Sequence, residues 1–164
     1  MLFNGHTIRP AGKRIGGALL IVLFCLHWRP SIASEEHSVY VAKTSGCGCC
    51  VAWIEHLESN GLPVRSENMA MGRLMQFKVQ SGINAELASC HTARIGRYTI
   101  EGHVPVRDIR RLRTEQPDAV GLTVPGMPLG SPGMDQGSER ETYDVLLIRS
   151  DGSTVVYATY PSSD

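Results

Sequence analysis

The hexapeptide SGCGCC, Ser45–Cys50, places three cysteines within four positions, between a β-rich stretch and a helical one. Residues 38–44, SVYVAKT, alternate as a strand does, whereas residues 51–61 carry apolar side chains at helical spacing and end on a glycine. The chain must therefore pass from a strand to a helix through a turn that holds thiols. This order predicts an α/β domain with a cysteine motif after its first strand.

The rest of the chain continues the alternation. Pro105 and Pro117 delimit a third apolar-faced helix, and Gly96-Arg97 separates two short β-rich runs as a hairpin requires. Together the patterns predict β-α-β-α-β-β-α, which is the thioredoxin-like order. The elements after the first helix are a strand in residues 62–68, a helix in 71–82, strands in 92–96 and 98–104, and a helix in 105–116.

Two features follow the third predicted helix. Glycine and proline are dense in residues 121–134, GLTVPGMPLGSPGM, which predicts a long loop. Residues 143–150 and 154–160 alternate around Asp151-Gly152 and predict a β-hairpin. The predicted fold class is thus α/β and thioredoxin-like, with an appended C-terminal β-hairpin and a long Gly/Pro-rich loop.

The N-terminal residues 1–33 have the features of a cleaved secretory signal peptide. Lys13 and Arg14 precede a twelve-residue apolar run that is too short to span a bilayer comfortably, and small residues stand at Ser31 and Ala33. We predict that residues 34–164 form a single domain that is exported to the periplasm and has no membrane anchor after cleavage. The alternative is an uncleaved anchor.

Cleavage before Ser34 changes the composition of the chain. Cys25 leaves, so the five cysteines become four, and Lys+Arg falls from 16 to 12 against 16 Asp+Glu, a net charge of −4. A mildly acidic domain is a poor candidate for nucleic-acid binding. No Ser-His-Asp arrangement, phosphate-binding glycine loop or paired carboxylates indicate hydrolysis or group transfer.

The remaining cysteines suggest metal binding. Cys47 and Cys50 have the C-x-x-C spacing of a redox dithiol, but Cys49 between them would attack their disulfide. In a thioredoxin-like topology, the loop before the third strand passes beside the first turn, so Cys90 is the predicted fourth sulfur. Two alternatives stay open, namely a redox dithiol and a pair of structural disulfides.

The metal is predicted from the softness of its ligands and from the compartment. Tetrathiolate sites suit zinc, iron–sulfur clusters or Cu(I). Iron clusters are usually assembled inside the cell, and zinc needs no crowding of three cysteines. Thiolates that bridge ions favour copper, so we predict a multinuclear Cu(I) site.

Four further residues are candidate labile ligands or supporting groups around that site. His91 directly follows Cys90, and His103 ends the adjacent strand. Met127 and Met134 each end a PGM triplet in the predicted loop, and a thioether is a soft donor. We expect both methionines to cap the core beneath the loop, and the loop itself to cover the site.

Long motifs also carry a resemblance to a known family. SGCGCCVAWIEHLESNG, ELASCHTARIGRYTIEGHVP, DIRRLRTEQPDAVGLTVPGMPLGSPGM and YDVLLI resemble the CopG-type family of exported bacterial copper-resistance proteins over residues 39–160. The resemblance implies a thioredoxin-like domain that holds a cysteine-bridged copper cluster, with ligands at Cys47, Cys49, Cys50 and Cys90.

The predicted function is that of a periplasmic copper-binding protein that contributes to copper resistance, with copper ions and other periplasmic copper-handling proteins as its partners. The rival function is a thiol-disulfide or copper-dependent oxidoreductase that uses Cys47 and Cys50. Against the rival, Cys90-His91-Thr92 stands where thioredoxin-like oxidoreductases usually carry a proline.

Overall fold

A computed structural model describes residues 1–2, 38–135 and 137–162. The proposed signal peptide and its cleavage position fall almost wholly outside these residues. The elements, in chain order, are β1 (Val39–Lys43), α1 (Gly48–Ser59), β2 (Val64–Asn68), α2 (Met71–Gln80), β3 (Thr92–Ile95), β4 (Tyr98–Glu101), α3 (Val106–Glu115), β5 (Ala119–Thr123), β6 (Tyr143–Arg149) and β7 (Thr154–Tyr160).

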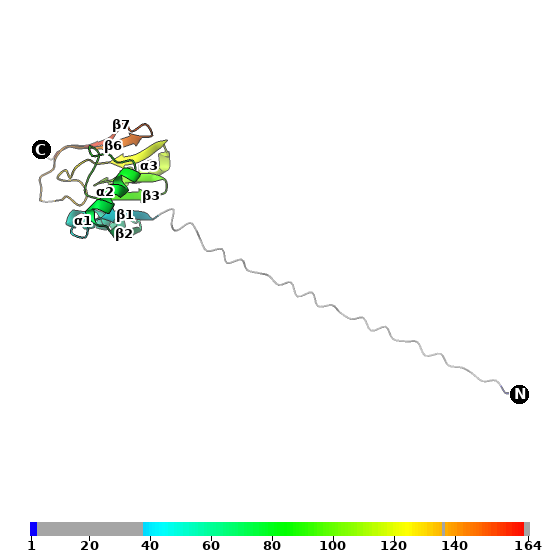
Figure 1. Ribbon diagram of the computed structural model, residues 1–164. Helices are drawn as coiled ribbons and strands as arrows, with labels where there is room; N and C mark the ends of the chain where they lie inside the picture. The colour runs from blue at the N-terminus through cyan, green and yellow to red at the C-terminus, as the bar shows by residue number, and fades with distance from the viewer. Residues whose placement is uncertain (3–37, 136, 163–164) are drawn as a thin grey trace. The chain divides into compact units, whose positions relative to one another are not determined.

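The strands form one mixed sheet in the order β2-β1-β3-β4-β5-β6-β7 (Figure 1). The pairs β1/β2 and β4/β5 are parallel, and the remaining neighbours are antiparallel. Within the described residues the domain is therefore mixed α/β, with seven strands and three helices. The predicted order of the first seven elements is confirmed, and the thioredoxin-like assignment stays a prediction.

Strand alternation distributes the helices over both faces of the sheet. Val39 and Val41 pack in one buried cluster with Trp53 of α1 and Ile109 of α3. Ala42, which points to the opposite face, packs in a second cluster with residues that include Leu74 of α2. The helices α1 and α3 thus cover one face, and α2 covers the other.

One predicted loop boundary is wrong. The Gly/Pro-rich segment was expected to be loop from Gly121, yet β5 extends through Thr123 and joins β4 to β6. A Cβ atom at Gly121 would lie only 1.7 Å from the carbonyl oxygen of Thr99 in β4. Glycine here permits close approach of two paired strands beside an irregularity in the β5/β6 register, rather than marking a loop.

The predicted C-terminal hairpin is present, with β6 and β7 paired around Asp151-Gly152. It extends the central sheet through β5 instead of standing beside the domain as an appendage. None of the helices described is both long and apolar enough to cross a membrane.

Candidate metal centre

The N-terminus of α1 gathers three of the four cysteines. Cys47 is the N-cap residue, and its Sγ accepts a hydrogen bond from the backbone N–H of Cys50 at 3.3 Å. Cys49 and Cys50 follow within the first helical turn, and Cys50 is fully buried. In the described state Cys47 and Cys50 are joined by a disulfide, whereas Cys49 and Cys90 are free thiols.

Cys90 reaches this turn because of the sheet order. The strand that follows Cys90, β3, pairs with β1, and Thr92 at the start of β3 lies opposite Ala42 near the end of β1. The segment before β3 therefore lies beside the turn that follows β1. Sγ of Cys49 lies 3.5 Å from that of Cys47 and 3.7 Å from that of Cys90.

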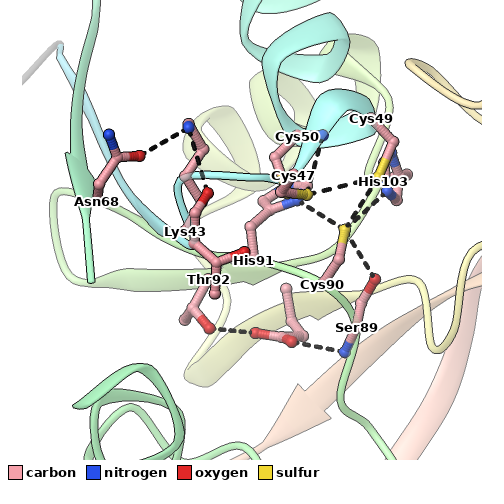
Figure 2. Close-up of a disulfide and its surroundings, with 12 residues drawn as sticks. Lys43, Cys47, Cys49, Cys50, Asn68, Ser89, Cys90, His91, Thr92 and His103 are labelled. Atoms are coloured by element: carbon pink, nitrogen blue, oxygen red, sulfur yellow. Dashed lines mark hydrogen bonds between the residues drawn. A yellow bond between two sulfur atoms is a disulfide. The ribbon is translucent and has the colours of Figure 1, made fainter. Parts of the chain in front are cut away.

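The four sulfurs all lie within 4.8 Å of one another (Figure 2). The convergence of residues 41 positions apart was predicted from topology, and the structure brings these four side chains together. Their sulfurs form a compact donor set that suits a soft metal ion once the disulfide is reduced to two thiolates. Metal binding by them stays a prediction.

Both candidate histidines also lie against Cys90. Nε2 of His103 is 3.1 Å from Sγ of Cys90, and Nδ1 of His91 is 3.3 Å from it. Nδ1 of His103 lies 2.8 Å from the carbonyl oxygen of Pro132, which can only accept a hydrogen bond. Burial lowers the pKa of His103, so the ring is neutral and its Nε2 lone pair faces the sulfur.

His91 is fully buried, and its ring lies 4.3 Å from that of Trp53. Burial, with the nearby His103 and Lys78, holds the pKa of His91 well below its ordinary value. Nε2 of His91 is buried and has no hydrogen-bond partner among the described residues. The neutral imidazole of His91 therefore lies on the buried side of the cysteine site, against Cys90.

Burial raises the pKa of the Cys90 thiol to about 12, and the nearby Cys49 contributes a smaller part of this rise. In the metal-free protein the thiol of Cys90 consequently keeps its proton, which it can donate to Nε2 of His103. A bound cation would replace this proton, because metal ions bind the thiolate.

The Gly/Pro-rich loop contacts the residues around the site at Gly126, Pro132 and Gly133. A Cβ atom at Gly133 would lie 2.7 Å from the backbone nitrogen of Trp53 and 2.8 Å from the carbonyl oxygen of Cys49. Ser89 donates a hydrogen bond to the carbonyl of Gly126, and Pro132 accepts from His103. The predicted position of the loop over the cysteine turn agrees with these contacts.

The two loop methionines differ in exposure. Met127 is 52% exposed, which contradicts its expected role as a cap on the core. Met134 is half-buried, and its backbone N–H donates to Ser131 within a tight turn.

One group near the site was missed from the sequence. Lys78 and Glu101 form a buried ion pair, with Nζ 2.5 Å from Oε1, and Glu101 also contacts the residues that flank Cys90 and His91. The sequence signal was Lys78 itself, which falls on the otherwise apolar stripe of its helix with Leu74. Its partner lies 23 residues away and has no local signature.

A comparison with models of protein families finds a match that overlaps part of this site. A family model described as "Protein of unknown function, DUF411" matches residues 87–134, which include Cys90 and both candidate histidines. No match is found among curated protein sequences.

Two solved structures are similar to the chain over most of its length. "Copper resistance protein copG- Form 1" is 42% identical, with a TM-score of 0.72, and the match covers 76% of this chain and 97% of that one. Form 2 of the same protein is 41% identical, with a TM-score of 0.71, over 76% and 98% of the two chains. At this identity and coverage, the chain belongs to the CopG family of copper resistance proteins.

Proposed function

We propose that the chain is an exported, periplasmic copper-binding protein that contributes to copper resistance by holding several Cu(I) ions between Cys47, Cys49, Cys50 and Cys90. The observation that carries the proposal is the convergence of four cysteine sulfurs within 4.8 Å. The solved relatives are named copper resistance proteins, and the thiolate is a preferred ligand of Cu(I).

The order of β1, α1, β2, α2, β3, β4 and α3 supports a thioredoxin-like domain in residues 34–164. Export rests on the signal-like residues 1–33. Within the site, His103 is the best-placed additional ligand, because its Nε2 lone pair already points at Cys90. His91 shapes the inner wall, and Met127 and Met134 remain predicted labile ligands.

Metal loading requires reduction of the disulfide between Cys47 and Cys50. An external dithiol supplies the two electrons and is itself oxidised to a disulfide, while the S–S bond opens to two thiolates that bind the metal. The separations of the Cys49 sulfur from those of Cys47 and Cys90, 3.5 and 3.7 Å, also suit one tetrahedral zinc ion with Zn–S bonds of about 2.3 Å. Copper is preferred because the crowded thiolates can bridge and because the relatives are copper resistance proteins.

The test is an anaerobic titration of the reduced exported chain with Cu(I), in the presence of a Cu(I) chelator and, in a second series, excess zinc. We expect more than one Cu(I) per chain, retention of copper against zinc, and loss of ions with Cys90→Ser. Met75→Leu is the matched control, since it removes an exposed sulfur on α2. Failure of the reduced chain to bind Cu(I), or displacement of copper by zinc, would overturn the proposal.

The disulfide itself favours a second candidate function, thiol-disulfide exchange. A substrate thiolate would attack Sγ of half-buried Cys47, displacing Cys50 as a thiolate and forming a mixed disulfide. A second substrate thiol would then release Cys47, so that the substrate leaves oxidised and the pair remains as a dithiol. Cys49, 3.5 Å from Cys47, competes for the same sulfur, which makes this function the less favoured one.

A further inference from the structure

Glu101 is a buried carboxylate that connects the two sides of the Cys90–His91 segment. Its Oε1 accepts a hydrogen bond from the backbone N–H of Ser89 at 2.7 Å, and its Oε2 accepts one from the Thr92 hydroxyl at 2.6 Å. Figure 2 shows Ser89 and Thr92 on either side of Cys90 and His91. Glu101 therefore fixes the chain immediately before Cys90 and immediately after His91.

Lys78 supplies the compensating charge from α2. Its Nζ lies 2.5 Å from Oε1 of Glu101 and donates to the Thr92 hydroxyl at 3.0 Å. Lys78 is 3% exposed, and Glu101 and Thr92 are 0% exposed. The three side chains thus form a closed network in which both carboxylate oxygens and the lysine have partners.

The network sits at a defined place in the sheet. Thr92 and Glu101 are directly paired across the antiparallel β3/β4 ladder, so their side chains lie on the same face. On the other side of Glu101, the backbone N–H of Gly102 donates to the carbonyl of His91. His103 follows two residues after Glu101, the last residue of β4. The end of β4 therefore positions both Cys90 and the imidazole of His103 that faces it.

A gain in folding stability does not by itself explain the buried Lys78–Glu101 ion pair. Moving two charges from water into the interior is costly, and replacing a buried ion pair by apolar residues of similar volume is often neutral or stabilising. An apolar pair could not, however, accept the hydrogen bonds from Ser89 and Thr92. What the carboxylate adds is a fixed conformation of the segment that carries Cys90.

We infer that Lys78, Glu101 and Thr92 are positioning residues that hold the Cys90 sulfur against the cysteine turn of α1. The inference rests on the proposed copper-binding function and adds the groups that preorganise its fourth ligand. The three side chains act on Cys90 through its neighbours Ser89 and Thr92. Removing groups that support a metal ligand typically changes metal affinity by about 10- to 100-fold. None of the three is proposed to contact copper.

The first test measures copper in the exported chain. The double variant Lys78→Met/Glu101→Leu removes both charges together, and Thr92→Val removes the hydroxyl at nearly constant shape. We expect each to stay folded by circular dichroism, to bind Cu(I) about tenfold or more weakly, and to show an altered thiolate-to-copper absorption spectrum. Thr92→Ser, which keeps the hydroxyl, should restore both readouts.

Asp108→Asn is the control for a general loss of stability. Asp108 is also a buried carboxylate, but its hydrogen bond joins α3 to Tyr160 of β7 rather than to the Cys90 segment. The Asp108→Asn variant should have a lower unfolding temperature but the same Cu(I) affinity and absorption spectrum as the wild type. If the double variant does not fold, the comparison of Thr92→Val with Thr92→Ser decides the question by itself.

A second readout needs no copper. In oxidised, metal-free protein carrying Cys49→Ser, Cys90 is the free thiol beside the disulfide. Its alkylation rate by iodoacetamide, measured at one fixed pH, rises when the thiol becomes more exposed to solvent, because exposure increases both its accessibility and its thiolate fraction. Thr92→Val should raise this rate several-fold, and Thr92→Ser should not. Wild-type alkylation, copper affinity and spectrum in folded Thr92→Val would overturn the inference while leaving the copper proposal intact. A raised alkylation rate in a protein that binds no Cu(I) would support positioning and overturn only the proposed function.

Discussion

Cys49 is the residue that separates the two functions considered for this chain. Its sulfur lies between those of Cys47 and Cys90, at 3.5 and 3.7 Å. In a copper site this position links the helix turn to the β3 segment, because one thiolate can bridge ions bound on either side. In a dithiol enzyme the same sulfur would attack the Cys47–Cys50 disulfide and compete with substrate.

Cys49→Ser should therefore lower copper stoichiometry, and copper tolerance in cells, as severely as Cys47→Ser or Cys50→Ser. Removing any bridge disrupts a shared cluster, so the three variants are expected to behave alike. The measurements are elemental analysis of Cu(I)-loaded protein and growth in copper. Full loading of Cys49→Ser, together with insulin-reducing activity that depends on Cys47 and Cys50, would instead support the oxidoreductase.

At the scale of elements, periodicity and turn residues were sufficient to predict the order from β1 to α3 and the final hairpin. The missed strand, β5, contains a glycine that the close approach of Thr99 requires, so composition alone suggested a loop. The convergence of Cys90 with the α1 turn followed from topology. The Lys78–Glu101 pair could not be predicted, because the burial of a charge depends on a partner distant in sequence.

The loop that covers the cysteine turn and the residues just after it offer a matched pair of substitutions. Gly133 and Gly137 both have positive φ, +85° and +79°, so alanine strains each backbone by about 1–2 kcal/mol. At Gly133 alone of these two, a Cβ would also collide with α1 beside Cys49. We expect Gly133→Ala to displace the loop and weaken Cu(I) binding about tenfold, as loss of a supporting contact does, while Gly137→Ala should not.

Chelator competition measures the Cu(I) affinity of Gly133→Ala and Gly137→Ala, and circular dichroism confirms that both variants fold. Equal Cu(I) affinities for Gly133→Ala and Gly137→Ala would show that the loop contact with α1 does not contribute to the site.

At the scale of the whole molecule, the proposed function combines export of the chain with a metal site of soft thiolate ligands. After the proposed cleavage the chain would have a net charge of −4 and four cysteines. One sheet supports the site from β1, β3 and β4. The proposed export matters for the chemistry, because a disulfide such as that between Cys47 and Cys50 persists outside the reducing cytoplasm. In the proposed function, copper loading would therefore depend on a supply of reducing equivalents.

Cleavage of the signal peptide is a separate prediction. The exported protein should begin at Ser34, because the small residues at Ser31 and Ala33 fit the specificity of signal peptidase. Intact mass spectrometry of protein from the periplasmic fraction measures this directly. A mass that retains residues 1–33, with the protein in the membrane fraction, would contradict both the cleavage and the count of four cysteines.

The most direct test of the central claim is the metal content of the protein purified anaerobically from the periplasm of copper-challenged cells. We predict several copper ions per chain, present as Cu(I) with sulfur ligands by X-ray absorption, and no disulfide between Cys47 and Cys50 in the loaded form. Cys90→Ser, purified in parallel, should carry fewer ions in a folded domain. Protein that carries zinc or no metal, with the Cys47–Cys50 disulfide intact, would contradict the account.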